Sequence, residues 1–181
     1  MRFGYSVAAA VAAVSMVAIA PAPAIAKEKA KKVPPSEITI PAPQEGSGQV
    51  VFFRPGGMGG AVACSIHENG EKISSLGGGR YFILNTTPGR HEYSVKTEKT
   101  DTLALEVEDG DRKWVACKIK MGIMVGRPDI RPSSEEEFRS AKKFAMVDDE
   151  DMNPELGAMT SEQVAAALAG GKAAAPAEEA E

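Results

Sequence analysis

The sequence contains few of the side chains that carry out catalysis or bind metal ions. It has two histidines, His67 and His91, two cysteines and one tryptophan among 181 residues. Neither histidine stands at metal-ligand spacing from another histidine, a cysteine or a carboxylate, and each falls on the outward face of an expected strand. No Gly-x-Ser-x-Gly elbow is present, and no serine or threonine has an identifiable base or orienting acid. We therefore expect no catalytic residue, no metal and no cofactor.

Long hydrophobic runs and strong basic charge are also scarce. After residue 26 no apolar run approaches the roughly 20 residues that a membrane-spanning helix needs. No basic stripe is interleaved with aromatic side chains, which argues against a nucleic-acid partner. Residues 27–131 carry 16 basic and 13 acidic side chains, whereas residues 133–181 carry 4 and 12. The acidic end is therefore expected to be a solvated segment.

The N-terminus has the three parts of a secretory signal peptide. Arg2 supplies a positive charge, Tyr5 to Ala20 is an uncharged apolar run, and Ala24-Ile25-Ala26 offers small residues for cleavage. This pattern predicts a signal peptide over residues 1–26 and a periplasmic or secreted protein with no stable membrane span after cleavage. A retained membrane anchor is the alternative. No cysteine follows the apolar run, so a lipid anchor on cysteine is not expected.

Two segments outside the central region have the composition of linkers and tails. Residues 27–48 are rich in lysine and proline and are predicted to be extended and mostly unpaired. The lysines at the start of this segment could contact anionic lipid headgroups, although a plain linker is the simpler interpretation. Residues 148–181 form an acidic, alanine-rich tail, in which Thr160 and Gln163 predict the start of a short helix. Most of residues 27–46 and all of 172–181 are expected to be dispensable for folding.

Residues 49–147 have the pattern of one β-sandwich domain. Apolar and polar residues alternate along short segments that are separated by glycine-rich or proline-rich turns about every ten residues. The fold class we predict is an all-β core, a small antiparallel β-sandwich of about seven or eight strands with short C-terminal helices. The clear strands are expected at residues 49–54, 61–67, 72–76, 80–84, 91–95, 103–107 and 114–121.

Local signals add detail at both ends of this domain. Asn69-Gly70 favours a two-residue hairpin turn, because both central positions need positive φ. Residues 126–132 contain two prolines and are predicted to form a loop. Ser133 followed by Glu136 resembles a capping box, which predicts a helix at residues 134–142, and residues 144–147 are predicted to be one more strand.

Cys64 and Cys117 are predicted to form a disulfide inside the sandwich. They are the only cysteines, and the signal peptide sends them to a compartment in which disulfides persist. Strand alternation places Cys64 with Ile66 and Cys117 with Val115, so both sulfurs should face the core. A bridge that closes this loop would stabilise the fold by roughly 4 kcal/mol. Two buried free thiols are the alternative.

Several motifs together resemble a family of small exported bacterial β-sandwich domains of unknown function. These motifs are Val51-Phe52-Phe53-Arg54-Pro55, the Asn69-Gly70 hairpin, Tyr81-Phe82 after a glycine run, and Pro88-Gly89-Arg90-His91. Many members of this family look like lipoproteins, whereas this chain lacks the lipidated cysteine. The resemblance covers about residues 49–122 and implies no established catalytic residues.

The functional prediction is an exported, non-enzymatic module that binds a partner or associates with the cell envelope. Arg54, Tyr81 and His91 are the candidate surface contacts, because polar and aromatic residues near loop ends are ready recognition points. The partner would be an envelope protein or a cell-surface component. Two alternatives remain open: a small hydrolase with an unrecognised site, and a subunit of an envelope assembly joined by strand addition.

The signal-peptide interpretation predicts that the mature protein begins at Lys27. The short apolar run and the Ala-x-Ala sequence place cleavage directly after Ala26. N-terminal sequencing of the exported protein should therefore read Lys-Glu-Lys-Ala. An exported protein that still begins with Met1 would contradict the prediction and support a retained anchor.

Overall fold

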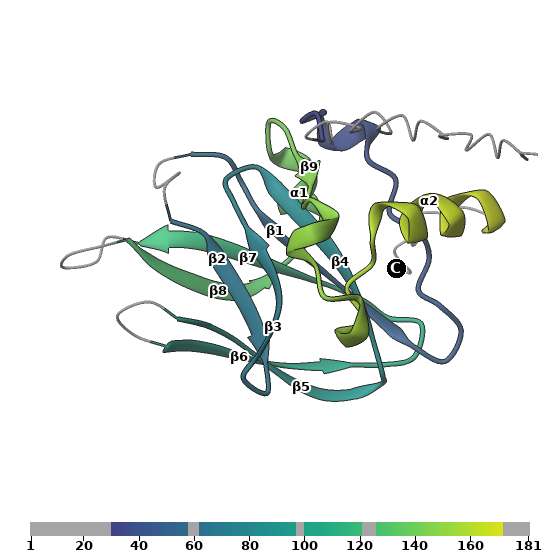
Figure 1. Ribbon diagram of the computed structural model, residues 1–181, viewed down its shortest axis with the longest axis horizontal. Coiled ribbons are helices and arrows are strands. Elements are labelled where there is room, and N and C mark those ends of the chain that lie inside the picture. The colour runs from purple at the N-terminus through teal and green to yellow at the C-terminus, as the bar shows by residue number, and fades with distance from the viewer. Residues whose placement is uncertain (1–29, 58–61, 97–99, 121–125, 172–181) are drawn as a thin grey trace, which may run out of the picture.

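The computed structural model describes residues 30–57, 62–96, 100–120 and 126–171, and these ranges confirm an all-β core (Figure 1). Within these ranges, nine strands form two sheets that pack face to face, and two short α-helices follow the last long strand. The predicted signal peptide and residues 172–181 lie outside the described residues. Within the described ranges, no helix combines the length and hydrophobicity needed to cross a membrane.

The two sheets share the strands unequally. The five-stranded sheet has the order β8-β7-β1-β4-β9, and the four-stranded sheet has the order β3-β2-β5-β6. The strands are β1 (Gly48–Arg54), β2 (Cys64–Glu68), β3 (Glu71–Leu76), β4 (Arg80–Thr86), β5 (Gly89–Lys96), β6 (Thr100–Val107), β7 (Arg112–Lys120), β8 (Arg127–Ser133) and β9 (Ala145–Met146). Because β1 pairs in parallel with β7, and β4 with β9, the larger sheet is mixed and not wholly antiparallel as predicted.

Strand β1 is buried along its whole length and contributes to two separate hydrophobic cores. Val50 and Phe52 point into the inner core, which lies between the two sheets and includes Phe82, Tyr93 and Val115. The neighbouring side chains, Val51 and Phe53, point the other way, because successive side chains of a strand face opposite sides. They belong to the outer core, which lies on the far face of the five-stranded sheet. The protein therefore has a third layer.

The inner core contains the predicted disulfide. Cys64 on β2 and Cys117 on β7 are bonded, and their Cα atoms are 6.6 Å apart. Both residues are almost fully buried, in line with the alternation of the two strands. The bond links the two sheets directly, so the disulfide prediction is confirmed and the alternative of free thiols is wrong.

The outer core is rich in aromatic rings. Phe138, on helix α1 (Glu135–Ser140), stacks on Phe144 with ring centroids 4.7 Å apart and meets the edge of Phe53 at 5.4 Å. Ser134 caps α1 by accepting a hydrogen bond from the Glu137 amide. The predicted helix is therefore present, but it is shorter than expected and its cap lies one residue later.

The N-terminal segment packs on the sheet, so the prediction of an extended, unpaired linker is wrong for residues 33–41. Val33 and Phe144 exchange two backbone hydrogen bonds of 2.8 Å. A short 3-10 helix, η1 (Pro35–Glu37), follows, and Ile38 and Ile40 are buried in the outer core. This layer was missed because a few apolar residues among prolines give no periodic pattern.

The C-terminal segment is also part of the domain, which therefore extends beyond the predicted boundary at residue 147. It contains the 3-10 helices η2 (Asp149–Asp151) and η3 (Pro154–Leu156) and helix α2 (Ser161–Gly170). Met152 and Ala158 join the inner core, whereas Met159 and Val164 join the outer core. The predicted capping box of α2 is confirmed, because Thr160 and Gln163 cap the helix reciprocally.

Strand β8 occupies residues that were predicted to form a loop. Its prolines, Pro128 and Pro132, pair with β7 in the strand at one edge of the sheet, where proline is tolerated. Between them, the Ile130 amide donates a 2.8 Å hydrogen bond to the carboxylate of Asp101 on β6. The prediction of a loop is wrong because an edge strand does not need every backbone N–H.

The outer core predicts that Ile40→Ala will destabilise the protein by about 2–4 kcal/mol. Ile40 is 5 % exposed, and shortening a buried isoleucine removes apolar contacts and leaves a cavity. Urea unfolding should show this loss in the free energy of unfolding. The neighbouring exposed residue supplies a control, since Thr39→Ala should change that energy by less than about 0.5 kcal/mol. Equal, small effects at both positions would contradict the packing of this segment.

Candidate functional site

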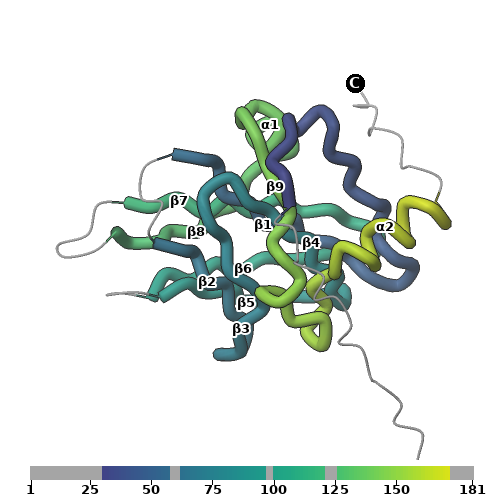
Figure 2. Tube along the Cα trace, turned by 45° about the horizontal axis from the view of Figure 1, so that its top comes forward, coloured from purple at the N-terminus to yellow at the C-terminus, as the bar shows by residue number. Residues whose placement is uncertain are grey.

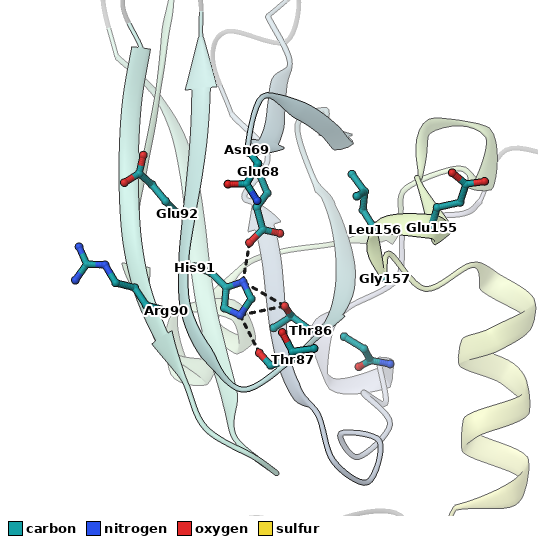
Figure 3. A pocket seen from close by; sticks show the side chains of 11 residues that line it. Glu68, Asn69, Thr86, Thr87, Arg90, His91, Glu92, Glu155, Leu156 and Gly157 are labelled. Atoms are coloured by element: carbon teal, nitrogen blue, oxygen red, sulfur yellow. Dashed lines mark hydrogen bonds and ion pairs between the residues drawn. The ribbon is translucent and has the colours of Figure 1, made fainter.

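A polar groove of about 610 Å³ lies where the chain passes from one sheet to the other (Figure 3). Three segments line it: the end of β4 with the turn into β5, the hairpin between β2 and β3, and the residues that follow Pro154. The side chains used in the argument below are Glu68, Thr86, Arg90, His91, Glu92 and Glu155. The groove is therefore the candidate functional site.

Two local backbone features shape the groove. Asn69 and Gly70 adopt φ values of 51° and 85°, which confirms the predicted hairpin turn that carries Glu68 at its start. Gly157 has φ of 89° and its carbonyl accepts a 3.0 Å hydrogen bond from the Asn85 amide. A Cβ atom on Gly157 would lie 2.1 Å from the Asn85 carbonyl oxygen, so only glycine allows this approach.

His91 is held through both ring nitrogens. Its Nδ1 lies 2.6 Å from a carboxylate oxygen of Glu68, and its Nε2 donates to the Thr87 carbonyl oxygen at 2.8 Å. The side chains of His91 and Glu68 are only 12 % and 16 % exposed. Because a carbonyl oxygen only accepts hydrogen bonds, Nε2 carries a hydrogen in this arrangement. The imidazole thus joins the β2 hairpin to the turn between β4 and β5.

Thr86, His91 and Glu68 contain the residue types of a catalytic triad but not its geometry. The Thr86 hydroxyl lies 3.3 Å from Nδ1 and 3.2 Å from Nε2, so it approaches neither nitrogen selectively. The nitrogen that would act as the base toward it already donates to the Thr87 carbonyl. A nucleophile needs an aligned hydrogen bond to a free base, and this arrangement does not provide one.

A tyrosine supports the histidine from the core side. The ring of Tyr93 stacks on His91, with centroids 6.0 Å apart and an interplanar angle of 11°. Burial raises the pKa of the Tyr93 phenol, and the nearby Glu68 carboxylate raises it further against a smaller opposing effect of Thr86. The phenol therefore stays neutral, and the Tyr93 ring packs behind the imidazole at the floor of the groove.

The rim of the groove carries charges that point into solvent. Arg90 and Glu92 lie on one side and Glu155 on the other, and all three side chains are exposed (Figure 3). None of the three forms an ion pair with another described residue. Across the described ranges, no group of three or more His, Cys, Asp or Glu side chains could hold a metal ion.

The structure buries two of the three predicted surface contacts, Arg54 and Tyr81, and places the third, His91, in the groove. Arg54 is 3 % exposed and donates to the backbone carbonyls of Val62 and Leu76, and burial lowers its pKa. Tyr81 is 7 % exposed and packs against Phe138 in the outer core. The prediction of surface contacts is therefore wrong for Arg54 and Tyr81. His91 lines the groove, although it is held by neighbours more firmly than a surface residue would be.

The sequence interpretation missed the other groove residues. Glu68 directly precedes the Asn-Gly turn, and Thr86 precedes the Pro-Gly turn that leads to His91, so all three stand beside turn signals. Their meeting depends on the pairing of β2 with β5, which matches His67 to Ser94 and Glu68 to Tyr93. No local pattern in the sequence predicts that pairing.

The edges of the sheets bear on the alternative of strand addition. The prolines and the capped Ile130 amide block β8, and Val33 and residues 157–159 cover the edge formed by β9 and β4. The Ile73 carbonyl on β3 accepts a hydrogen bond from the Asn153 amide. Within the described ranges, the outer edges of β6 and β8 pair with no other strand, and the prolines and the Asp101 contact obstruct that of β8.

Comparison with known proteins identifies one domain. Residues 44–128 match the model of a family described as "Protein of unknown function (DUF2846)". The match runs from just before β1 to the start of β8 and covers slightly less than half of the chain. It contains Glu68, Thr86 and His91, but neither the N-terminal segment nor Glu155. No curated protein and no solved structure matches the chain.

The Glu68–His91 pair should be energetically coupled. A double-mutant cycle with Glu68→Ala and His91→Ala should give a coupling energy of about 1–3 kcal/mol, because the pair is largely shielded from water. Urea unfolding of the four proteins measures it. The pair Lys120–Asp129, whose lysine is 62 % exposed, is the control, and its coupling should stay below about 1 kcal/mol. A coupling for Glu68 and His91 no larger than that of the control would contradict the geometry.

Proposed function

We propose that the protein is an exported, non-enzymatic β-sandwich module that binds an envelope or cell-surface component through the groove around His91. One observation carries this proposal: the groove presents unpaired charges at its rim above a floor in which both ring nitrogens of His91 are held by neighbouring residues. A preformed floor of this kind does not have to be ordered when a partner binds, which reduces the entropy cost of association. It is suited to recognition.

The charges at the rim indicate the chemistry of the partner. Arg90 lies close to Glu92 on one side of the groove, and Glu155 lies on the other (Figure 3). A partner with both cationic and anionic groups, such as a polar stretch of polypeptide, complements this arrangement. Complementary charges of this type set specificity and the rate of association more than total affinity.

The geometry of His91 supports a non-enzymatic role. In an enzyme, a general base must be able to accept a proton from the reacting group. Here one imidazole nitrogen donates to a carbonyl and the other meets a carboxylate. The hydrolase alternative would require that Nε2 of His91 leave the Thr87 carbonyl when substrate binds, while Nδ1 keeps its contact with Glu68.

Export is supported by two independent features. The N-terminal pattern of charge, apolar run and small residues has the form of a signal peptide. The buried disulfide between the sheets is compatible with an oxidising compartment outside the cytoplasm. The proposal therefore places the groove where it can meet envelope components.

Cross-linking in intact cells tests the proposal. The cells would produce the unchanged protein or the double variant Arg90→Glu with Glu155→Lys, which reverses the charges at the rim. The cross-linked partner should decrease about tenfold or more in the variant, which corresponds to about 1.4 kcal/mol of binding energy. Lys96→Glu with Glu162→Lys is the matched control, since it makes the same charge changes at exposed positions outside the groove.

Two outcomes would contradict the proposed function. Equal cross-linking of the rim variant and the control would show that the groove is not the contact surface. Hydrolysis of an ester or peptide substrate by the purified protein, abolished by His91→Ala, would show that the groove is an active site.

A further inference from the structure

A basic surface lies at the end of the molecule where the described chain begins. Two segments supply it: residues 30–34, with Lys31 and Lys32, and residues 141–144, with Lys142 and Lys143. Neither segment contains an acidic residue. The antiparallel bridge between Val33 and Phe144 brings them together although more than one hundred residues separate them in sequence. Figure 2 shows the start of the described chain beside the loop that follows α1.

The four lysines remain available to an external partner. All four are exposed, and none forms an ion pair with another described residue. The ammonium group of Lys32 donates to the Gly78 carbonyl, which fixes its position near Gly79. The nearby cation Arg80 is already neutralised by Asp148 at 3.2 Å. We call these four lysines the basic end.

Two more lysines stand in the sequence just before the described residues. Lys27 and Lys29 precede the described residues, with Glu28 as the single acid among them. Before them stands the apolar segment that is expected to direct the chain to a membrane or to hold it there. The basic end is thus the part of the folded domain that connects directly to the membrane-directed segment.

We propose that the basic end binds the anionic headgroups of a membrane surface. Lysines close to an anionic bilayer each strengthen binding by about fivefold, and several together give stable but reversible attachment. The effect acts over about 10 Å at moderate salt, so it requires lysines gathered at one exposed position. This proposal goes beyond the groove and does not depend on it.

The basic end and the groove lie at opposite ends of β4, so attachment through the basic end would orient the groove. The basic end adjoins the start of this strand, where Arg80 and Tyr81 pair with β9. The groove lies at its other end, where Thr86 leads into the turn toward His91. Seven residues of strand separate the two sites by roughly 20 Å. A domain attached through its basic end would therefore present the groove away from the membrane (Figure 1).

Binding to lipid vesicles tests the proposal. The protein, expressed with its own N-terminal segment and purified as the cell leaves it, is mixed with phosphatidylcholine vesicles that contain or lack phosphatidylglycerol. Binding should be stronger when phosphatidylglycerol is present and should weaken as salt is added. Lys142→Glu with Lys143→Glu should lower the additional binding by about 25-fold or more, since each lysine contributes about fivefold. Lys31→Glu, in the facing segment, should lower it by about fivefold or more.

A matched control separates the position of the charges from their number. Lys72→Glu with Lys96→Glu makes the same change in net charge at exposed positions on the four-stranded sheet. This control should bind within about threefold of the unchanged protein, because Lys72 on β3 and Lys96 at the end of β5 do not belong to the basic end. Equal losses in the control and the basic-end variants, or binding that ignores phosphatidylglycerol, would overturn the proposal. Tighter binding to dextran sulfate than to the anionic vesicles would also overturn it, in favour of a soluble polyanion.

Discussion

The burial of β1 on both faces is the constraint on which the rest of the structure depends. Val50 and Phe52 require a cover on one side and Val51 and Phe53 on the other, so two layers must pack on the central sheet. The four-stranded sheet provides one cover, joined to the central sheet by the Cys64–Cys117 disulfide. The N-terminal segment and the two helices provide the other. Segments with the composition of linkers and tails therefore become structural elements.

The same layering brings together the parts of the proposed binding surface. The floor of the groove comes from β2, β5 and the end of β4, whereas Glu155 belongs to the C-terminal segment that pairs beside β4. The groove is complete only when that segment is in place. The basic end likewise needs the pairing of Val33 with Phe144. Packing on the central sheet thus creates both surfaces, one at each end of β4.

Local patterns in the sequence predicted most of the strands, the Asn-Gly hairpin and the capping box of α2, because each depends on neighbouring residues or on alternation within one strand. The disulfide was predictable because the chain has only two cysteines, both on the inward face of an expected strand. The third layer could have been predicted from a different pattern in the sequence. Residues 50–53 and 81–84 are unbroken apolar runs, typical of strands buried on both faces. Such local patterns do not predict contacts between residues that are far apart in the sequence. Buried Arg54 and Tyr81 looked like surface residues, and the meeting of Glu68 with His91 depends on strand pairing.

The central claim is that the outer layer and the sandwich form one cooperative unit around β1. Trp114, the only tryptophan, lies on β7 with its side chain in the outer core at the edge of Phe53, so its fluorescence is sensitive to the packing of the outer layer. Far-UV circular dichroism reports the sheets. Equilibrium unfolding in urea, followed by both signals, should give one transition with the same midpoint. A Trp114 transition at clearly lower urea than the loss of the sheets would contradict the account, because the outer layer would then be a detachable cover.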